Sequence, residues 1–383
     1  MERPRVGFAV IVRQWLRIGI TGFGGPPAHI AMLRSLCVER RRWMAPRDFE
    51  RAVAMASVLP GPASTQVAIY CAWWLRGSAG ALLGGLCFIV PGLVVIIALA
   101  AVFLASSPPT AVLAAGLGAG SAVAAVALRA GFDIALPLVR SSAGALRLRT
   151  ILYAVAGAAA AATLGPLLVV VLLACGAAEL LLERAGGVSG ALSLLPLRPG
   201  AVIAVAGGAG ALAWTALKVG ALSFGGGFVI VPLMQADAVS VHHWMTHAQF
   251  LNAVALGQVT PGPVLQTVSV VGYAAGGLPG ALLAAAVAFA PSFLFVLAAA
   301  PNLERLVEDH RVAAFLAGAG ASAAGAIIGV AVPLAAALTH GWQFALLAAS
   351  LVALFVARRS VLATLLACAF AGVVLVAAGA SDG

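Results

Sequence analysis

Charged residues are scarce in this sequence. Asp, Glu, Lys and Arg make up 9% of it, whereas a soluble domain typically carries about 25%. With so little charge the chain cannot cover a water-facing surface, which excludes an ordinary soluble domain. Apolar runs such as residues 111–139 and 312–338 exceed the ~20 residues that span a hydrocarbon core. The sequence therefore predicts an all-α integral membrane protein.

Metal-binding and redox motifs are also missing. The five cysteines are scattered and never form a CxxC pair, so a zinc or redox site has no support. There is no haem or flavin motif and no paired acid–base constellation, so we expect no enzyme, no cofactor and no metal. His242, His243 and His247 could suggest a metal site, but a solvated loop is the preferred interpretation.

The net charge of +10 would suggest nucleic acid in a soluble protein. Here the cations lie mostly in short loops between apolar runs, where Lys and Arg act as topology signals. We therefore expect a multi-pass protein of the inner membrane that binds no nucleic acid.

Two segments of the chain are related. Phe23-Gly24-Gly25 matches Phe224-Gly225-Gly226 at an offset of 224 − 23 = 201, and Pro60-Gly61-Pro62 matches Pro261-Gly262-Pro263 at the same offset. Trp43-Met44 and Phe49 also recur. An almost ungapped match through Trp, Phe and Pro indicates a duplication. We expect an N-terminal repeat (1–183), a linker (184–200) and a C-terminal repeat (201–383).

The two repeats differ in loop charge. The second loop, roughly 235–252, contains no Lys or Arg. Because cytoplasmic loops collect Lys and Arg, the first loop should face the cytoplasm and the second the other side. The halves are then inverted repeats, as in many secondary transporters, with about 10–12 transmembrane segments that include two re-entrant elements. The first loop carries Arg34, Arg40, Arg41, Arg42, Arg47 and Arg51.

The FGG and PGP runs predict broken helices. Proline ends a helix, glycine permits positive φ and close approach to backbone, and paired breaks in two halves point to a transport site. Half-helix N-termini suit an anion; the alternative is tight small-residue packing. The candidate substrate-binding residues are Phe23, Gly24, Gly25, Pro60, Gly61, Pro62, Ser64, Thr65, Gln66, Phe224, Gly225, Gly226, Gly227, Gln258, Thr260, Pro261, Gly262, Pro263 and Gln266.

Ionisable residues within apolar runs are the other candidates. Arg17 and Lys218 occupy matched positions before the FGG runs and could offset an anion's charge, or could snorkel from helix ends. Arg129 and Asp133 are four apart and therefore share a helix face, where they can pair with each other. His29 could titrate near neutrality, but a satisfied packing role is preferred.

These runs carry a family resemblance. FGGPPAHIAMLR, LPGPASTQVAIY, FGGGFVIVPLM, residues 244–264 and the later A-P-S-F resemble the chromate ion transporter (CHR) family, over about 17–91 and 218–295. The resemblance implies a long-chain, two-domain member that exports chromate, driven by the proton motive force, with sulfate as a competing oxyanion. Many members carry an acidic residue shortly after the first PGP run, where this chain has Gln66. A neutral amide cannot carry a proton, which puts proton coupling at this position in doubt.

Other functions stay open. Sulfate or another oxyanion could be the true cargo. A passive anion channel would use the broken helices to line a pore instead of an occluded site. The sequence also leaves a homodimer open.

Overall fold

In the computed structural model, residues 6–163, 168–184, 208–223, 230–302 and 309–379 are described. Every regular element within these ranges is a helix. Five of the described helices are long and apolar enough to cross a membrane by length and composition. This confirms the predicted all-α membrane fold. Three shorter apolar helices accompany the five, and the number of crossings stays a prediction.

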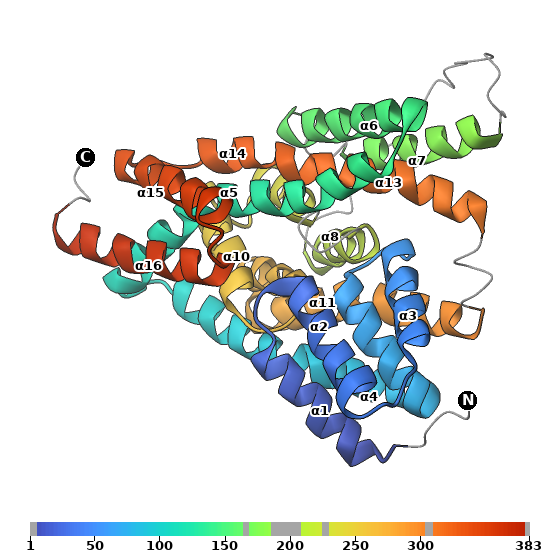
Figure 1. The fold of residues 1–383 in the computed structure, drawn as a ribbon. Coiled ribbons are helices and arrows are strands. Elements are labelled where there is room, and N and C mark those ends of the chain that lie inside the picture. The colour runs from blue at the N-terminus through green and yellow to red at the C-terminus, as the bar shows by residue number, and fades with distance from the viewer. Residues whose placement is uncertain (1–5, 164–167, 185–207, 224–229, 303–308, 380–383) are drawn as a thin grey trace.

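The first half of the chain contains long helices that follow several short ones (Figure 1). Its elements are α1 (Phe8–Thr21), α2 (Gly25–Arg34), the π-helix η1 (Ser35–Arg40), α3 (Pro46–Val58), α4 (Ala63–Phe103), α5 (Thr110–Ser141), α6 (Gly144–Thr163) and α7 (Leu168–Arg184).

The second half follows a similar order. Its elements are α8 (Ala209–Ala221), α9 (Ile230–Gln235), the π-helix η3 (Ala236–Val241), α10 (His247–Val259), the short 3₁₀ turn η4 (Val264–Gln266), α11 (Thr267–Ala299), the 3₁₀ turn η5 (Ala300–Asn302), α13 (His310–Gly329), α14 (Ala331–Ala336), α15 (Gly341–Leu351), the π-helix η6 (Val352–Val356) and α16 (Val361–Ala377).

Helices α4 and α11 are each folded sharply within their length. Arg76 and Gly77 leave helical geometry in α4, and Gly276 and Gly277 do so in α11. A side chain on Gly80 would collide with the backbone of Ala72, although residues eight apart in a straight helix are separated by about 12 Å. The chain therefore turns back on itself here, and the 13 residues from 63 to 75 form an arm of about 20 Å, too short to cross the hydrocarbon core alone.

Matched positions of the two segments share unusual backbone conformations. Arg42 and His243 have φ of 51° and 52°. Gly77 and Gly277, which match at an offset of 200 because the second segment is one residue shorter after the PGP run, have φ of 59° and 61°. The π-helices η1 and η3 start at Ser35 and Ala236, which again differ by 201. That the halves are inverted, with a linker at 184–200, stays a prediction.

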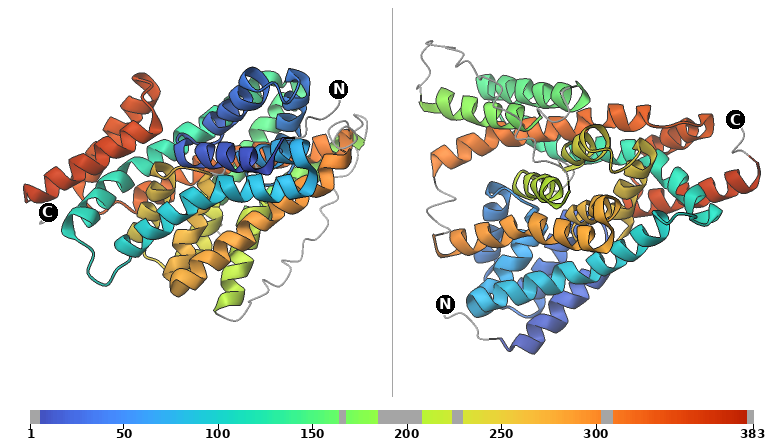
Figure 2. Two further views of the ribbon diagram at one scale, coloured as in Figure 1. Left: turned by 90° about the horizontal axis from the view of Figure 1, so that it is seen from below. Right: turned by 180° about the vertical axis from the view of Figure 1, so that it is seen from behind.

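The long helices form an interleaved bundle. α4 packs against α11, α1 lies on α4, and α8 lies on α11. Helices α6 and α7 of the first half pack mainly along α13 of the second, whereas α15 and α16 pack mainly on α5 (Figures 1 and 2). Glycines permit this close approach: a side chain on Gly157 would collide with the Ser322 carbonyl, and one on Gly118 with the Cys368 carbonyl. Such small-residue contacts are typical of helix packing in membranes.

Candidate functional site

The first PGP run interrupts the helical path between α3 and α4. Leu59 is extended, Gly61 has φ of +129°, and Pro62 caps α4. Prolines lack a backbone N–H, so Gly61 supplies the backbone donor within the run. Its N–H donates to the Ser223 carbonyl, 3.0 Å away in the other half of the chain.

The second PGP run makes the corresponding contact in the opposite direction. Gly262 has φ of +96°, and its N–H donates to the Gly22 carbonyl at 2.9 Å. Gly22 and Ser223 directly precede the two FGG runs. Each PGP break therefore touches the residue before the FGG run of the other half, so motifs about 160–240 residues apart in the chain meet.

Several hydroxyl groups next to the breaks lack hydrogen-bond partners within the described parts of the chain. Ser64 and Thr65 lie in the first turn of α4 and are buried, and a Cβ atom on Gly61 would lie 3.1 Å from Ser292 Oγ of α11. An unpartnered buried polar group costs about 1–3 kcal/mol, so a group of them needs a reason. Hydroxyls donate hydrogen bonds, which an anion would accept. Those without a partner among the described residues, on segments adjoining the breaks, are Ser64, Thr65, Ser223, Ser269 and Ser292.

Two buried glutamines lie at the breaks and donate hydrogen bonds to backbone carbonyls. Gln66 Nε2 donates to the Pro60 carbonyl at 2.7 Å, and Gln266 Nε2 donates to the Ile89 carbonyl at 2.8 Å. The Oε1 atom of each is buried with no partner among the described residues. A side chain on Gly92 would collide with the Pro261 carbonyl and approach Gln266. Both glutamines therefore lie where α4 and α11 meet at the breaks.

His29 also reaches the second break. Its Nε2 lies 2.8 Å from the Gly22 carbonyl, which can only accept, so Nε2 carries the proton. The imidazole is buried and packs edge-on against Phe88 with ring centroids 5.0 Å apart. The Gly22 carbonyl thus accepts from His29 and from Gly262 together. The side chain packs and supports the contact between the halves, but its Nδ1 atom is buried without a partner among the described residues, so the expected satisfied packing role is met only in part.

The two matched cations have different surroundings. Lys218 Nζ lies 2.6 Å from Asp237 Oδ2, which also accepts from Thr215 Oγ1 at 2.8 Å. Asp237 is buried, so the charge of Lys218 is already compensated. Arg17 is exposed on α1. Offsetting an anion's charge with either residue stays a prediction.

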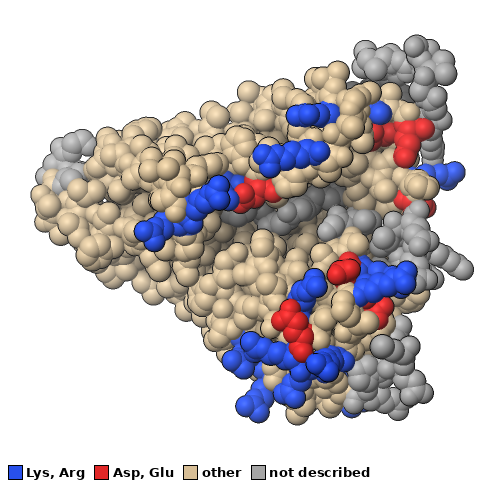
Figure 3. All heavy atoms as spheres, viewed as in Figure 1, with Lys and Arg blue, Asp and Glu red and all other residues tan. Residues whose placement is uncertain are grey.

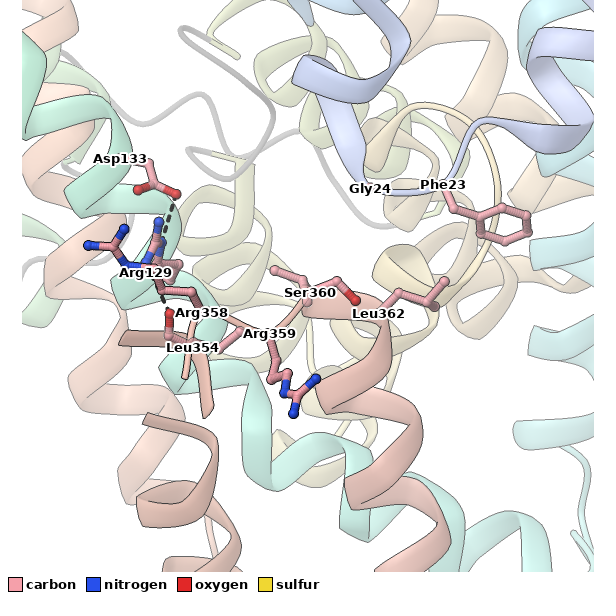
Figure 4. Close-up of a pocket in the computed structure, with 10 residues that line it drawn as sticks. Phe23, Gly24, Arg129, Asp133, Leu354, Arg358, Arg359, Ser360 and Leu362 are labelled. Carbon is pink, nitrogen blue, oxygen red and sulfur yellow. Dashed lines mark hydrogen bonds and ion pairs between the residues drawn. The ribbon is translucent and has the colours of Figure 1, made fainter. Parts of the chain in front are cut away.

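Phe23 and Gly24 of the first FGG run line a cleft of about 390 Å³ (Figure 4). Arg129 and Asp133 lie on its far wall and form the predicted pair, with Arg129 Nε 2.9 Å from Asp133 Oδ2. The segment from Leu354 to Leu362 completes the lining.

The remaining predicted residues divide into three groups. Thr260 is buried and its hydroxyl donates to the Leu256 carbonyl at 2.9 Å, whereas the Gln258 Nε2 atom has no partner among the described residues. Gly25 starts α2, and Pro263 precedes η4. The predicted residues Phe224, Gly225, Gly226 and Gly227 lie outside the described residues.

Ser223 and Ser292 were not among the predicted site residues. Ser223 directly precedes the second FGG run, and Ser292 follows Pro291, which corresponds to Pro91 at an offset of 200. A serine within the A-P-S-F run at a repeated proline was the signal that could have identified Ser292.

The chain matches known proteins over most of its length. The family described as chromate transporter matches residues 9–180 and 210–373. A chromate transport protein of Cupriavidus metallidurans is 32% identical over 346 residues, 87% of this chain and 84% of that protein. A chromate transport protein of Pseudomonas aeruginosa is 32% identical over 87% of this chain and 82% of that protein. A probable chromate transport protein of Synechococcus elongatus is 29% identical over 88% of this chain and 87% of that protein.

Among solved structures, none matches the chain. The family match covers both segments that contain the FGG and PGP runs, and it confirms the resemblance drawn from those runs. The long apolar helices agree with a multi-pass membrane protein. The chain belongs to the chromate transporter family.

Proposed function

We propose that this protein is a secondary active transporter that exports chromate, or a related tetrahedral oxyanion, across the inner membrane, using the proton motive force. The proposal is carried by the pair of reciprocal contacts at the breaks, Gly61 with Ser223 and Gly262 with Gly22. Beside them lie buried hydroxyls that have no partner in the part of the chain that the structure describes. Irregular backbone survives at membrane depth only where it is buried in protein or lines a cavity. The names of the relatives support chromate as cargo.

The hydroxyls are the donors available to the anion in this conformation. A tetrahedral dianion leaves water only if fixed donors replace its hydration. The N–H groups of Gly61 and Gly262 already donate to carbonyls of the opposite half. Ser64, Thr65 and Ser292 have no such partner among the described residues. Substrate binding therefore starts with hydroxyl donors, and the glycine N–H groups become available when the halves separate.

The reciprocal hydrogen bonds suit a rocking motion. Each is worth about 0.5–1.5 kcal/mol net, which is small enough to break and reform during a transport cycle. The shared φ values of matched glycines support two related halves, and the cation-rich first loop supports their inversion. Rocking of inverted halves would expose the midplane alternately to the two sides.

The membrane potential can drive export without a protonatable residue at Gln66. Moving charge across the membrane is worth about 2.3 kcal/mol per charge per 100 mV, hence about 4.6 kcal/mol for a dianion. Because the cytoplasm is negative, this term favours outward movement of an anion. The electrical part of the proton motive force therefore supplies the driving force that the neutral Gln66 cannot couple through a proton.

Flux of radiolabelled chromate and sulfate in proteoliposomes tests the proposal. We expect saturable chromate transport that is accelerated by an imposed potential, negative on the side that chromate leaves, and less by a pH gradient alone. Flux that does not saturate and proceeds at channel rates would assign a passive anion channel instead. Saturable sulfate flux without chromate flux would identify sulfate, and not chromate, as the transported anion.

A further inference from the structure

The cleft beside the first FGG turn carries a concentrated positive charge. Three arginines and one aspartate line it, Arg129, Arg358, Arg359 and Asp133, which gives it a net charge of +2. Figure 3 shows Lys and Arg side chains with an acidic neighbour along one rim of a hollow on this face. Its volume of about 390 Å³ lies within the roughly 300–1,000 Å³ of small-molecule sites.

Arg129 is held in place within this wall. Its Nε donates to Asp133 at 2.9 Å, its Nη1 donates to the Leu354 carbonyl at 3.0 Å, and its guanidinium lies 5.7 Å from the Phe355 ring centre. Asp133 would repel an anion if it were unpaired, but the ion pair neutralises it. The excess charge of the cleft therefore resides on Arg358 and Arg359.

Arg358 and Arg359 are exposed, and neither forms an ion pair with any residue in the described part of the chain. They precede α16, whose N-cap Ser360 also lines the cleft. The partial positive charge of this helix N-terminus adds to that of the arginines. In Figure 4 the Ser360 side chain lies between the arginine wall and the FGG turn.

The cleft is adjacent to the second break. Phe23 and Gly24 line it, and the preceding residue, Gly22, accepts hydrogen bonds from Gly262 and His29. A ligand in the cleft thus lies against the turn that joins the two halves. Arg358 and Arg359 are also the kind of residues that gather on cytoplasmic ends, the side from which exported cargo enters.

We propose that this cleft is a capture site for the divalent tetrahedral oxyanion, where Arg358 and Arg359 concentrate the cargo before it reaches the buried breaks. The inference rests on the proposed transport function. Guanidinium groups match oxyanions by paired N–H donors, and a cleft lined by one sign of charge raises the local concentration of the opposite ion. The cleft therefore lowers the chromate concentration that half-saturates transport but does not affect the maximal rate, which depends on the buried breaks.

Charge variants separate this role from a structural one. In phosphatidylcholine proteoliposomes, Arg358→Gln with Arg359→Gln should raise the half-saturating chromate concentration roughly tenfold, leave the maximal rate unchanged and weaken the dependence on salt, as for charges that act on encounter. Asp133→Asn should lower the half-saturating concentration, because the cleft then carries +3 while Arg129 keeps its Leu354 contact. Arg358→Lys with Arg359→Lys, which keeps both positive charges, should retain most of the wild-type affinity.

Arg47→Gln is the control for surface charge, since Arg47 is exposed and lies outside the cleft, and it removes one positive charge where the double glutamine variant removes two. It should leave the half-saturating concentration unchanged. Equal effects per charge removed in Arg47→Gln and in the double glutamine variant would overturn the proposal in favour of general surface charge. A weaker affinity in Asp133→Asn would also overturn it.

Two further comparisons complete the test: the lipid composition of the vesicles and the transport activity of the wild-type protein. If the double glutamine variant differs from the wild type only in vesicles that contain anionic phosphatidylglycerol, the cleft binds lipid headgroups and the proposal fails. If wild-type protein moves no oxyanion, the transport function fails. If the wild-type protein transports oxyanion and the cleft variants behave like the wild type, the transport function stands and only the proposed capture site is refuted.

Discussion

Gly92 offers a direct test of the contact between the breaks. It lies within α4 with ordinary helical backbone, and a side chain there would collide with the Pro261 carbonyl. Alanine in place of glycine favours a helix interior by about 1 kcal/mol, whereas forcing an extra methyl into a packed contact typically costs ~1–3 kcal/mol. Gly92→Ala should therefore be neutral or destabilise the protein by up to about 2 kcal/mol, and it should shift the second PGP run.

Gly320→Ala is the matched control, because a Cβ atom at this position in α13 would meet nothing within 4 Å. It should raise the thermal midpoint slightly and leave chromate flux unchanged. Gly92→Ala should leave the midpoint unchanged or lower it, and it should reduce flux strongly at unchanged protein level. Flux in Gly92→Ala equal to that in Gly320→Ala would refute the idea that transport depends on this contact.

Three further substitutions test neighbouring groups. Ser292→Ala should leave the thermal midpoint unchanged or raise it, because the Ser292 hydroxyl has no partner among the described residues. The same variant should raise the half-saturating chromate concentration several-fold, and an unchanged concentration would exclude Ser292 from the site. Asp237→Asn breaks a buried ion pair with Lys218 and should destabilise the protein by about 3 kcal/mol in thermal or detergent unfolding, an effect that Asp237→Leu combined with Lys218→Met should largely reverse. His29→Leu removes a hydrogen-bond donor to the Gly22 carbonyl and should slow transport. His29→Gln can still donate and should retain part of the transport rate. Equal rates in the two variants would argue against a role of this hydrogen bond in transport.

The sequence predicted the breaks well, because their cause is local. Proline and glycine act through their own backbone geometry, so Gly61 and Gly262, each flanked by two prolines, could be identified as breaks from the local sequence. The repeat also predicted that each of the two related segments contains one such break. Apolar length alone was enough to predict helices in a membrane.

The partners across the bundle could not be predicted from the sequence. Nothing local shows that the Gly61 N–H will find the Ser223 carbonyl, because that choice depends on how α4 and α11 pack. The same holds for Lys218, whose matched position suggested a shared role with Arg17, although Asp237 lies beside it only in the folded chain. The sequence located the two PGP breaks, but which residues meet across them was decided by tertiary packing.

The exchange of helices between the halves has a consequence for biosynthesis. Helices α6 and α7 leave the ribosome long before α13, along which they mainly pack. Until α13 is inserted, the face around Gly157 has only lipid or a transient neighbour to cover it. A truncated product that stops after the first half would keep this face uncovered. We expect membrane quality control to recognise such a product, so that the first half is retained only when the second half is synthesised with it.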